Sequence, residues 1–185
     1  MNVAETPPGG GRLSEDVSFE PRRIAVLTVS DTRDATTDTS GQLLADRIVR
    51  DGHTLAGRAL VKDDVAAIQA QLRGWIDDPE VDVIISTGGT GLTGRDMTPE
   101  AVRPLFDREI QGFEAVWHMT SFQTVGVSTM QSRACAGLAG GTLIFALPGS
   151  HGACKDGWDK VIRWQLDNRH RPCNLAELLP RFTER

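Results

Sequence analysis

The amino-acid sequence predicts an α/β protein with three layers, in which helices cover both faces of a mostly parallel sheet. Runs of apolar, often β-branched residues alternate along the chain with segments whose apolar residues recur at helical spacing. This alternation is typical of parallel strands that are connected by crossover helices. Four of the predicted strands also end in polar or glycine-rich residues, as expected where ligands bind at the carboxyl edge of such a sheet.

The first predicted unit is a strand followed by a helix. An apolar run over Arg23–Val29 predicts a buried strand. Either Thr39 or Ser40 can accept a hydrogen bond from a free amide of the following turn, so we expect one of them to cap a helix. The helix is predicted to end near Arg50, because Gly52 can adopt the left-handed conformation that terminates helices.

The second unit repeats this order. Thr54–Val61 is predicted to be extended, and either Asp63 or Asp64 is expected to cap the helix that follows. We assign the cap to Asp64 and leave Asp63 for chemistry. The helix is predicted from an apolar stripe at helical spacing, formed by Val65, Ile68, Leu72, Trp75 and Ile76.

The third strand and its glycine-rich extension form the most informative stretch of the chain. Val81–Ser86 is predicted to be a buried strand. Thr98 is a good N-cap and Pro99 a good first residue for the next helix. A strand, a glycine-rich loop and a helix start together predict an anion site, most often for phosphate. Backbone amides can approach a ligand closely at the glycines, which are Gly88, Gly89, Gly91 and Gly94.

Shorter elements follow the glycine-rich loop. Pro99–Asp107 is predicted to be a helix, and Gly112 to break the chain before a second helix over Phe113–Phe122. Ser128–Gly137 is ambiguous and could be an irregular strand, paired with the next strand across Gly140–Gly141. The last predicted elements are a strand over Thr142–Leu147, a helix over about Ala153–Leu166 and an apolar turn over Leu175–Leu179.

Length and composition favour one domain without a membrane or nucleic-acid partner. The chain has 185 residues; residues 1–20 are rich in proline, glycine and acidic side chains and are expected to form a disordered tail. Residues 21–185 would form a single domain with a C-terminal extension from about residue 167. The net charge of −5 argues against a general nucleic-acid-binding protein. No secretion signal or membrane-length apolar run is evident, so we expect a cytoplasmic protein.

Two familiar site types fit the sequence poorly. Gly89-x-Gly91-x-x-Gly94 matches the dinucleotide fingerprint, but that motif needs an acidic residue ending a strand about 20 residues further on, where the sequence predicts a helix. A P-loop needs a lysine and then serine or threonine directly after its glycines. This chain has no such pair there, so the loop is not a P-loop. The few, widely spaced cysteines and the unpaired histidines favour free thiols and disfavour a transition-metal centre.

The carboxyl ends of four predicted strands would lie at the same edge of the sheet. They carry Ser30-Asp31, Asp63-Asp64, Thr87–Gly91 and Pro148–Ser150. Mg²⁺ in phosphate sites takes one or two carboxylates and shares its other positions between water and phosphate. The aspartates at this edge, Asp31, Asp63 and Asp64, together with Asp96 after the glycines, therefore indicate a magnesium site. Asp64 is assigned to the helix cap, and Asp96 can instead bond the backbone of its own loop.

Other polar residues near this edge stay open to two interpretations. Arg95 can pair with phosphate or remain a solvated surface charge, and His151 can reach the ligand or lie on the surface. Ser30 and Ser150 lie in no Gly-x-Ser-x-Gly motif, and the sequence places no histidine to activate them. Binding or turn roles are therefore favoured for these serines over nucleophilic catalysis.

Several motifs, taken in order, resemble those of the MoaB/MogA family of molybdenum cofactor biosynthesis proteins. They are LTVSD, DTSGQLLAD, TGGTG followed by RDMTPEA, and FALPGS, and the resemblance runs from about Arg23 to Leu179. The segments LFDREIQGFEAV, TMQSRA and RPCNLAELLP are similar to the MoaB branch in particular.

The resemblance implies a three-layer fold that assembles as trimers or hexamers and binds molybdopterin at the strand edge. It also implies adenylylation of molybdopterin by Mg-ATP, as in the MogA branch, with other enzymes of molybdenum cofactor biosynthesis as candidate partners. Asp63 and Asp96 match the two functional aspartates of the family, as catalytic residues and magnesium ligands. Substrate and nucleotide binding is expected of Ser30, Asp31, Thr87, Gly88, Gly89, Thr90, Gly91, Pro148, Gly149 and Ser150.

Two differences from the family pattern leave alternatives open. The adenylylating branch usually has proline where this chain has Lys62, whereas some inactive MoaB-branch members lack the aspartate that this chain keeps as Asp63. The expected activity is adenylylation of molybdopterin with release of pyrophosphate. The alternative is a non-catalytic molybdopterin-binding oligomer. A CinA-like nucleotide pyrophosphatase is less favoured, because the sequence shows no appended domain.

Overall fold

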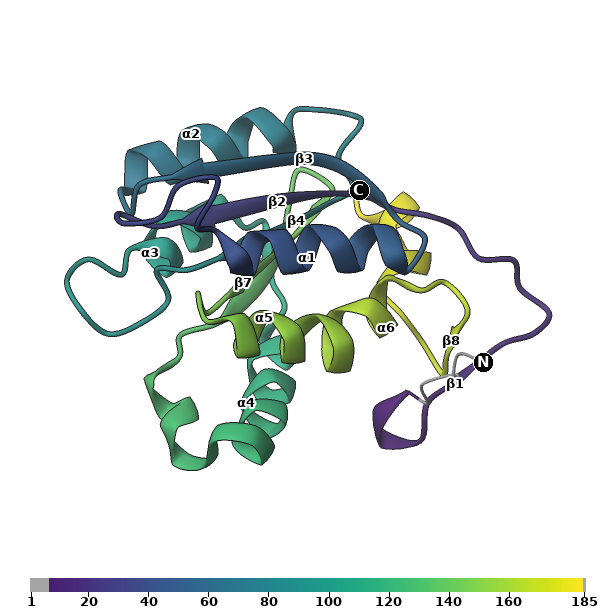
Figure 1. Ribbon diagram of the computed structural model, residues 1–185. Helices are drawn as coiled ribbons and strands as arrows, with labels where there is room; N and C mark the ends of the chain where they lie inside the picture. The colour runs from purple at the N-terminus through teal and green to yellow at the C-terminus, as the bar shows by residue number, and fades with distance from the viewer. Residues whose placement is uncertain (1–6, 185) are drawn as a thin grey trace.

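A six-stranded mixed sheet forms the centre of the computed structural model, which describes residues 7–184 (Figure 1). The strand order is β3-β2-β4-β7-β6-β5. The first four of these are parallel, whereas β6 and β5 each run antiparallel to the preceding neighbour. The strands are β2 (Arg23–Val29), β3 (Thr54–Val61), β4 (Val83–Thr87), β5 (Arg108–Glu109), β6 (Cys135–Ala139) and β7 (Thr142–Leu147).

Helices cover both faces of this sheet, which confirms the predicted three-layer α/β/α fold (Figure 1). One apolar cluster joins the sheet to α1, α4, α5 and α6, and a second joins its other face to α2 and α3. The helices are α1 (Thr39–Arg50), α2 (Val65–Ile76), α3 (Thr98–Val102), α4 (Gln111–Val125), α5 (His151–Gly157) and α6 (Arg163–Leu166).

The central strands are apolar throughout because both of their faces are covered. In β2, Ile24 and Val26 pack on the α1 side, whereas Ala25 and Leu27 pack on the α2 side. This alternation of side chains follows from the two-residue repeat of an extended chain. None of the four side chains is exposed, so the sheet holds its carboxyl edge on a rigid support.

Helix starts differ in part from the predicted ones. The cap of α2 is Asp64, as predicted, and its carboxylate accepts a hydrogen bond from the amide of Ala67 at 2.9 Å. The cap of α1 is Asp38, and the prediction of Thr39 or Ser40 was wrong. Asp38 is the better cap because the Thr28 hydroxyl donates to one carboxylate oxygen at 2.7 Å while the other accepts from Gly41.

The helix after the glycine-rich loop is shorter than predicted. It covers Thr98–Val102 and continues as a 3₁₀ turn over Arg103–Leu105, where Pro104 cannot donate the next helical hydrogen bond. Thr98 is the first helical residue and does not cap the helix; its hydroxyl donates to the carbonyl of Gly88 at 2.8 Å. The α3 helix is thereby tied directly to the loop.

The fourth helix is longer than predicted, and Gly112 does not break it. It runs over Gln111–Val125 and is followed by a 3₁₀ turn over Gly126–Gln131. A glycine lowers helix stability only slightly in the first turn, where its amide has no intrahelical acceptor in any case. The ambiguous segment becomes a strand only from Cys135, and β6 pairs with β7 across a turn at Gly140–Gly141, as considered from the sequence.

The last helix begins earlier than predicted, at His151, with the Ser150 hydroxyl accepting from the amide of Ala153. It passes through a π-helical turn over Trp158–Ile162 before α6. The apolar turn predicted over Leu175–Leu179 is present as a 3₁₀ turn over Ala176–Arg181, and Leu175 and Leu179 pack against the core.

A disordered tail was predicted over residues 1–20, of which residues 1–6 lie outside the described part of the chain. In the structure a 3₁₀ turn over Pro8–Gly10 is followed by β1 (Arg12–Leu13), which pairs antiparallel with β8 (His170–Arg171). Phe19 adds an edge-to-face ring contact with His53 at 5.1 Å. Among the described residues, no helix has the length and apolar content needed to cross a membrane.

Candidate functional site

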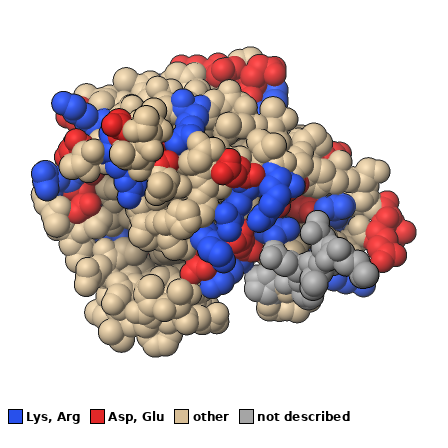
Figure 2. Space-filling model, viewed as in Figure 1, with Lys and Arg blue, Asp and Glu red and all other residues tan. Residues whose placement is uncertain are grey.

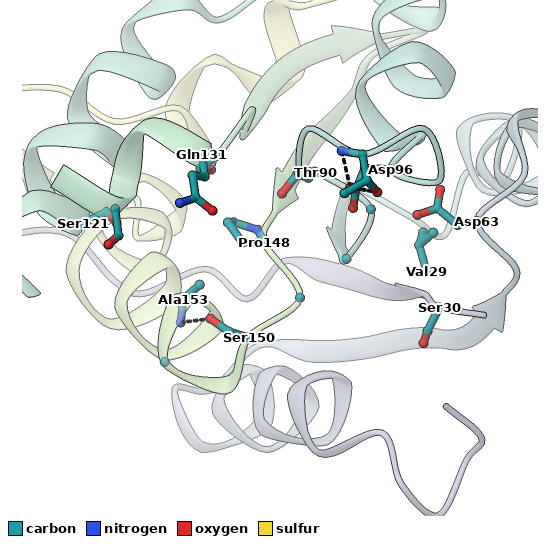
Figure 3. Close-up of a pocket in the computed structure, with 18 of the residues that line it drawn as sticks. Val29, Ser30, Asp63, Thr90, Asp96, Ser121, Gln131, Pro148, Ser150 and Ala153 are labelled. Carbon is teal, nitrogen blue, oxygen red and sulfur yellow. Dashed lines mark hydrogen bonds between the residues drawn. The ribbon is translucent and has the colours of Figure 1, made fainter. Parts of the chain in front are cut away.

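The four strand ends surround one cavity of about 570 Å³ (Figure 3). Its wall is built by Ser30–Arg33 after β2, Asp63 after β3, Gly88–Gly91 after β4 and Pro148–Ser150 after β7. The parallel register of these strands brings together residues that lie far apart in the sequence. A cavity of this size is within the range of pockets that hold small molecules.

The glycine-rich loop presents free backbone amides to this cavity. The carbonyls of Gly88 and Gly89 accept hydrogen bonds from the hydroxyl and amide of Thr98, at 2.8 and 2.9 Å. In a trans peptide the following amide points the opposite way, so the amides of Gly89 and Thr90 face away from α3. No described group accepts from either amide, and both residues line the cavity. They are therefore available to an anion.

Two of the glycines are required by their surroundings. Gly88 and Gly89 have φ values of 102° and 63°, a left-handed conformation that other residues rarely adopt. A Cβ at Gly88 would overlap the carbonyl oxygen of Val29, and one at Gly89 would lie 2.5 Å from Oδ2 of Asp63. The loop can approach the end of β2 and the Asp63 carboxylate this closely only without side chains.

Asp63 is a half-buried carboxylate with one oxygen held by the protein. Its Oδ1 accepts from the amide of Met97 at 2.9 Å, and its own amide donates to Asp31 at 3.2 Å. No described residue donates to Oδ2. Burial raises the pKa of Asp63, and the negative charges of Asp96 and Asp31 add to this effect.

Asp96 has the opposite environment. Its Oδ2 accepts from the amide and the hydroxyl of Thr93, at 2.8 and 2.5 Å. The Thr93 hydroxyl is the main cause of the lowered pKa of Asp96. A divalent cation fits this pair chemically, because it would offset the repulsion around Asp63. The described residues contain no cluster of three side chains able to hold a metal, so a cation here would need oxygen ligands from phosphate and water.

The loop after β7 is held by hydrogen bonds from three side chains, those of Thr87, Ser40 and Arg33. Thr87 is fully buried and does not line the cavity; its hydroxyl donates to the carbonyl of Pro148 at 3.1 Å and lies 2.9 Å from Sγ of Cys154. The carbonyl of Gly149 accepts from Ser40 at 2.9 Å and from Nη2 of Arg33 at 3.0 Å. Thr87 thus positions the loop from outside the cavity.

The structure separates the remaining sequence candidates. Ser30 accepts from the amide of Arg33 at 3.1 Å, and Ser150 caps α5, so both hydroxyls have turn roles at the cavity wall. Arg95 lines the cavity as an exposed cation. His151 is exposed and lies outside the cavity, in a separate surface pocket.

One wall of the cavity was missed from the sequence. It comes from α4 and the 3₁₀ turn after it, with Asp156 of α5 at its edge. Figure 3 shows Ser121 and Gln131 at this end and Asp63 and Asp96 at the other, with Pro148 between. The sequence signal is weak: Trp117, Ser121 and Thr124 recur at helical spacing, and a polar turn follows the helix. The residues of this wall are Trp117, Ser121, Thr124, Ser128, Thr129, Gln131 and Ser132.

The arrangement suits a molecule with phosphate at one end and a polar ring system at the other. At the glycine-rich end, backbone amides and two arginines, Arg33 and Arg95, can bind phosphate oxygens, and the aspartate pair can hold a cation. At the α4 end, hydroxyl and amide side chains can donate and accept hydrogen bonds. The cavity therefore offers groups that can bind phosphate and a cation at one end and a polar ring at the other.

Comparisons with known proteins identify the family of this chain. Residues 25–168 match the family described as "Probable molybdopterin binding domain". Molybdenum cofactor biosynthesis protein B of Escherichia coli (strain K12) is 53% identical over 157 residues, which cover 85% of this chain and 92% of that protein. The protein of the same name from Staphylococcus epidermidis is 45% identical over 152 residues, covering 80% and 86%.

Solved structures give the same assignment. A crystal structure of molybdenum cofactor biosynthesis protein B has a TM-score of 0.78 at 40% identity, and covers 81% of this chain and 94% of that one. The tungsten cofactor synthesizing protein MoaB from Pyrococcus furiosus has a TM-score of 0.71 at 34% identity, with coverage of 80% and 93%. The resemblance inferred from the sequence motifs is confirmed, and the chain belongs to the MoaB family of molybdenum cofactor biosynthesis proteins.

Proposed function

We propose that this protein adenylylates molybdopterin with Mg-ATP and releases pyrophosphate. The observation that carries the proposal is the cavity in which free amides of the glycine-rich loop adjoin the paired carboxylates Asp63 and Asp96. The family membership supports a substrate of the molybdopterin type. In this reaction a terminal phosphate oxygen of molybdopterin forms a bond to the α-phosphorus of ATP, and the bond to the β-phosphate breaks.

The chain's own residues supply orientation and charge. The amides of Gly89 and Thr90 hold phosphate oxygens at the glycine-rich end. Arg33 and Arg95 add positive charge, which stabilises the charge on the transferred group. Phosphoryl transfer needs such positioning more than it needs covalent assistance from the protein.

Asp63 and Asp96 are the residues that would hold Mg²⁺. Bound there, Mg²⁺ would neutralise phosphate oxygens in the transition state. Oδ2 of Asp63 has no donor in the described part of the chain, and repulsion from neighbouring carboxylates raises its pKa together with burial. These are properties of a carboxylate that is better satisfied by a cation than by the protein alone.

The α4 wall suits the pterin end of the substrate. Ser121 is buried at this wall, and Thr124 and Gln131 lie beside it in the cavity lining. Side chains of this kind match the alternating donors and acceptors of a heterocycle. Binding at both ends would align the phosphate of molybdopterin with the glycine-rich loop.

A pyrophosphate-release assay with purified protein, molybdopterin and Mg-ATP tests the proposal. Asp63→Asn and Asp96→Asn are each expected to lower turnover about 100-fold, as loss of one electrostatic contact does elsewhere. Asp64→Asn is the matched control, because Asp64 lies outside the cavity and asparagine also caps helices well. Full pyrophosphate release by both cavity variants would contradict the assignment.

The non-catalytic alternative predicts molybdopterin binding without turnover in the same assay. Lys62, the residue that differs from the adenylylating branch, is exposed and does not line the cavity. Its position gives no physical reason for loss of activity. A CinA protein from Thermoplasma acidophilum shares the fold at 18% identity and a TM-score of 0.56, and nucleotide pyrophosphatase activity has no further support.

We also propose that the protein assembles as a trimer or hexamer. The outer side of α4 and the following turn is apolar and exposed, and Figure 2 shows a lobe without charged side chains there, at the lower left. Contiguous patches of this kind usually mark an interface. Light scattering near the 20.1 kDa monomer mass would contradict this proposal. The exposed side chains are Val116, Met119, Phe122, Val125, Val127 and Met130.

A further inference from the structure

Arg133 lies behind the glycine-rich loop and outside the cavity that the loop lines. It follows the 3₁₀ turn after α4 and precedes β6, so it reaches the loop from the antiparallel part of the sheet. Its side chain is 30% exposed and borders a surface groove shared with Pro99, Glu100 and Arg103. The functions described above assign it no role.

Arg133 binds the loop at several points. Its backbone amide donates to the carbonyl of Thr90 at 2.9 Å, and its Nε donates to the carbonyl of Gly91 at 2.7 Å. Its Nη2 donates to the carbonyl of Asp96 at 2.6 Å, and its Nη1 pairs with the carboxylate of Glu100. A single guanidinium therefore ties together both sides of the loop segment between Gly91 and Asp96.

These contacts orient the loop. The carbonyls of Thr90 and Gly91 are held on the outer side, so the Gly91 amide is directed the opposite way, where it interacts with the Asp96 carboxylate. The bond to the carbonyl of Asp96 fixes the backbone from which its carboxylate projects. The positive charge of Arg133 also contributes, after the Thr93 hydroxyl, to the lowered pKa of Asp96.

We propose that Arg133 is a positioning residue for phosphate binding, which holds the backbone of Thr90, Gly91 and Asp96 in place without touching the substrate. The proposal rests on the adenylyl-transfer function described above. The planar guanidinium presents several donors in a fixed fork, which matches the three acceptors on Gly91, Asp96 and Glu100. A lysine keeps the charge but cannot reproduce this fork.

The test compares Arg133→Ala and Arg133→Lys with the control Arg103→Ala. Arg103 borders the same groove but pairs with Glu109 and Glu114, away from the loop. Two quantities are measured: pyrophosphate release from molybdopterin and Mg-ATP, and the affinity for inorganic pyrophosphate by calorimetry. Urea unfolding reports the folded state of each variant.

Both Arg133 variants are expected to lower kcat about 100-fold, as small misplacements of catalytic groups do. Their pyrophosphate affinity is expected to fall about tenfold, the equivalent of one lost hydrogen bond to a charged group. The KM for molybdopterin should stay near the wild-type value, because the α4 wall is unchanged. The control should match wild type in kcat, in KM and in pyrophosphate affinity.

Three results would overturn the proposal. The first is that kcat and pyrophosphate affinity stay at the wild-type values in either Arg133 variant. In Arg133→Lys this result would mean that the positive charge alone is sufficient. Another is an equal loss in the Arg103 control. The third applies if the wild-type protein itself releases no pyrophosphate, which contradicts the proposed adenylyl transfer. Pyrophosphate affinity then tests Arg133 alone, and equal affinities in wild type and Arg133→Lys would overturn its positioning role. Arg133→Lys keeps the test valid if the alanine variant does not fold.

Discussion

The two ends of the cavity differ in the groups that can bind a ligand. At the glycine-rich end the binding groups are backbone amides beside two carboxylates, and the approach of the strands leaves no room for a Cβ at Gly88 or Gly89. At the α4 end the groups are side chains on one face of a helix, such as Ser121 and Thr124. One end depends on backbone conformation, and the other on side-chain identity.

Under the proposed adenylyl transfer, this difference separates catalysis from substrate selectivity. Backbone amides bind any phosphate of suitable geometry, so the glycine-rich end suits the part that the two substrates have in common. Ser121 can change without disturbing the fold, because it faces the cavity and does not belong to the apolar core. We therefore expect changes at the loop to affect kcat and changes at α4 to affect substrate affinity.

The largest expected effect is that of Gly89→Ala. The new Cβ would lie 2.5 Å from Oδ2 of Asp63, at a residue with a φ of 63°. Turnover in the pyrophosphate-release assay should fall by more than about 100-fold, and urea unfolding should show a loss of about 1–2 kcal/mol. Gly94→Ala is the control, because nothing lies within 4 Å of a Cβ there. Turnover within tenfold of wild type would show that this close approach is dispensable.

A smaller effect is expected at the α4 end. Ser121→Ala removes one hydroxyl from the cavity wall and should raise the KM for molybdopterin by up to about tenfold, the value of one hydrogen bond. The kcat should change little. Thr120→Ala, one residue earlier and outside the cavity lining, is the matched control. A fall in kcat with unchanged KM would mean that the two ends do not divide the work as proposed.

The smallest effect concerns stability and distinguishes the two aspartates. Burial raises the pKa of Asp63, so its ionised form destabilises the folded protein at neutral pH. Asp63→Asn should therefore raise the urea midpoint at pH 7, and this gain should shrink as the pH falls and Asp63 takes up a proton.

Asp96→Asn should do the reverse. Hydrogen bonds from Thr93 lower the pKa of Asp96, so its ionised form stabilises the protein above the ordinary carboxyl pKa, and that contribution is lost on acidification. The substitution should lower the midpoint at pH 7, with a smaller difference near pH 4. Midpoints that shift in the same direction for both variants would contradict the opposite environments of the two carboxylates.

The same contrast explains what could be predicted from the sequence. Strand ends are marked by apolar runs such as Arg23–Val29, and parallel strands must end at one edge, so their convergence follows from pattern alone. The α4 wall was missed because Gly112 was taken as a helix break and Phe122 as the last helical residue. The second boundary left Thr124 and the 3₁₀ turn after α4 outside the helix that carries Trp117 and Ser121.

The contacts of long side chains could not be predicted from the sequence, for a different reason. Arg133 contacts Gly91 across 42 residues of sequence, and Arg33 contacts Gly149 across 116. Such contacts depend on how β6 and β7 place their neighbouring loops, which no local pattern encodes. The cap at Asp38 was missed for a related reason: Thr28, ten residues earlier, selects it over Thr39 and Ser40.

The Cys154 thiol under the cavity has a chemical consequence. Burial raises its pKa to about 11, and only the thiolate reacts readily with oxidants and alkylating agents. At neutral pH the sulfur beneath the site is therefore inert, whereas Cys173 is exposed. Thiol-directed reagents will modify the C-terminal extension at Cys173 and leave the floor of the cavity intact.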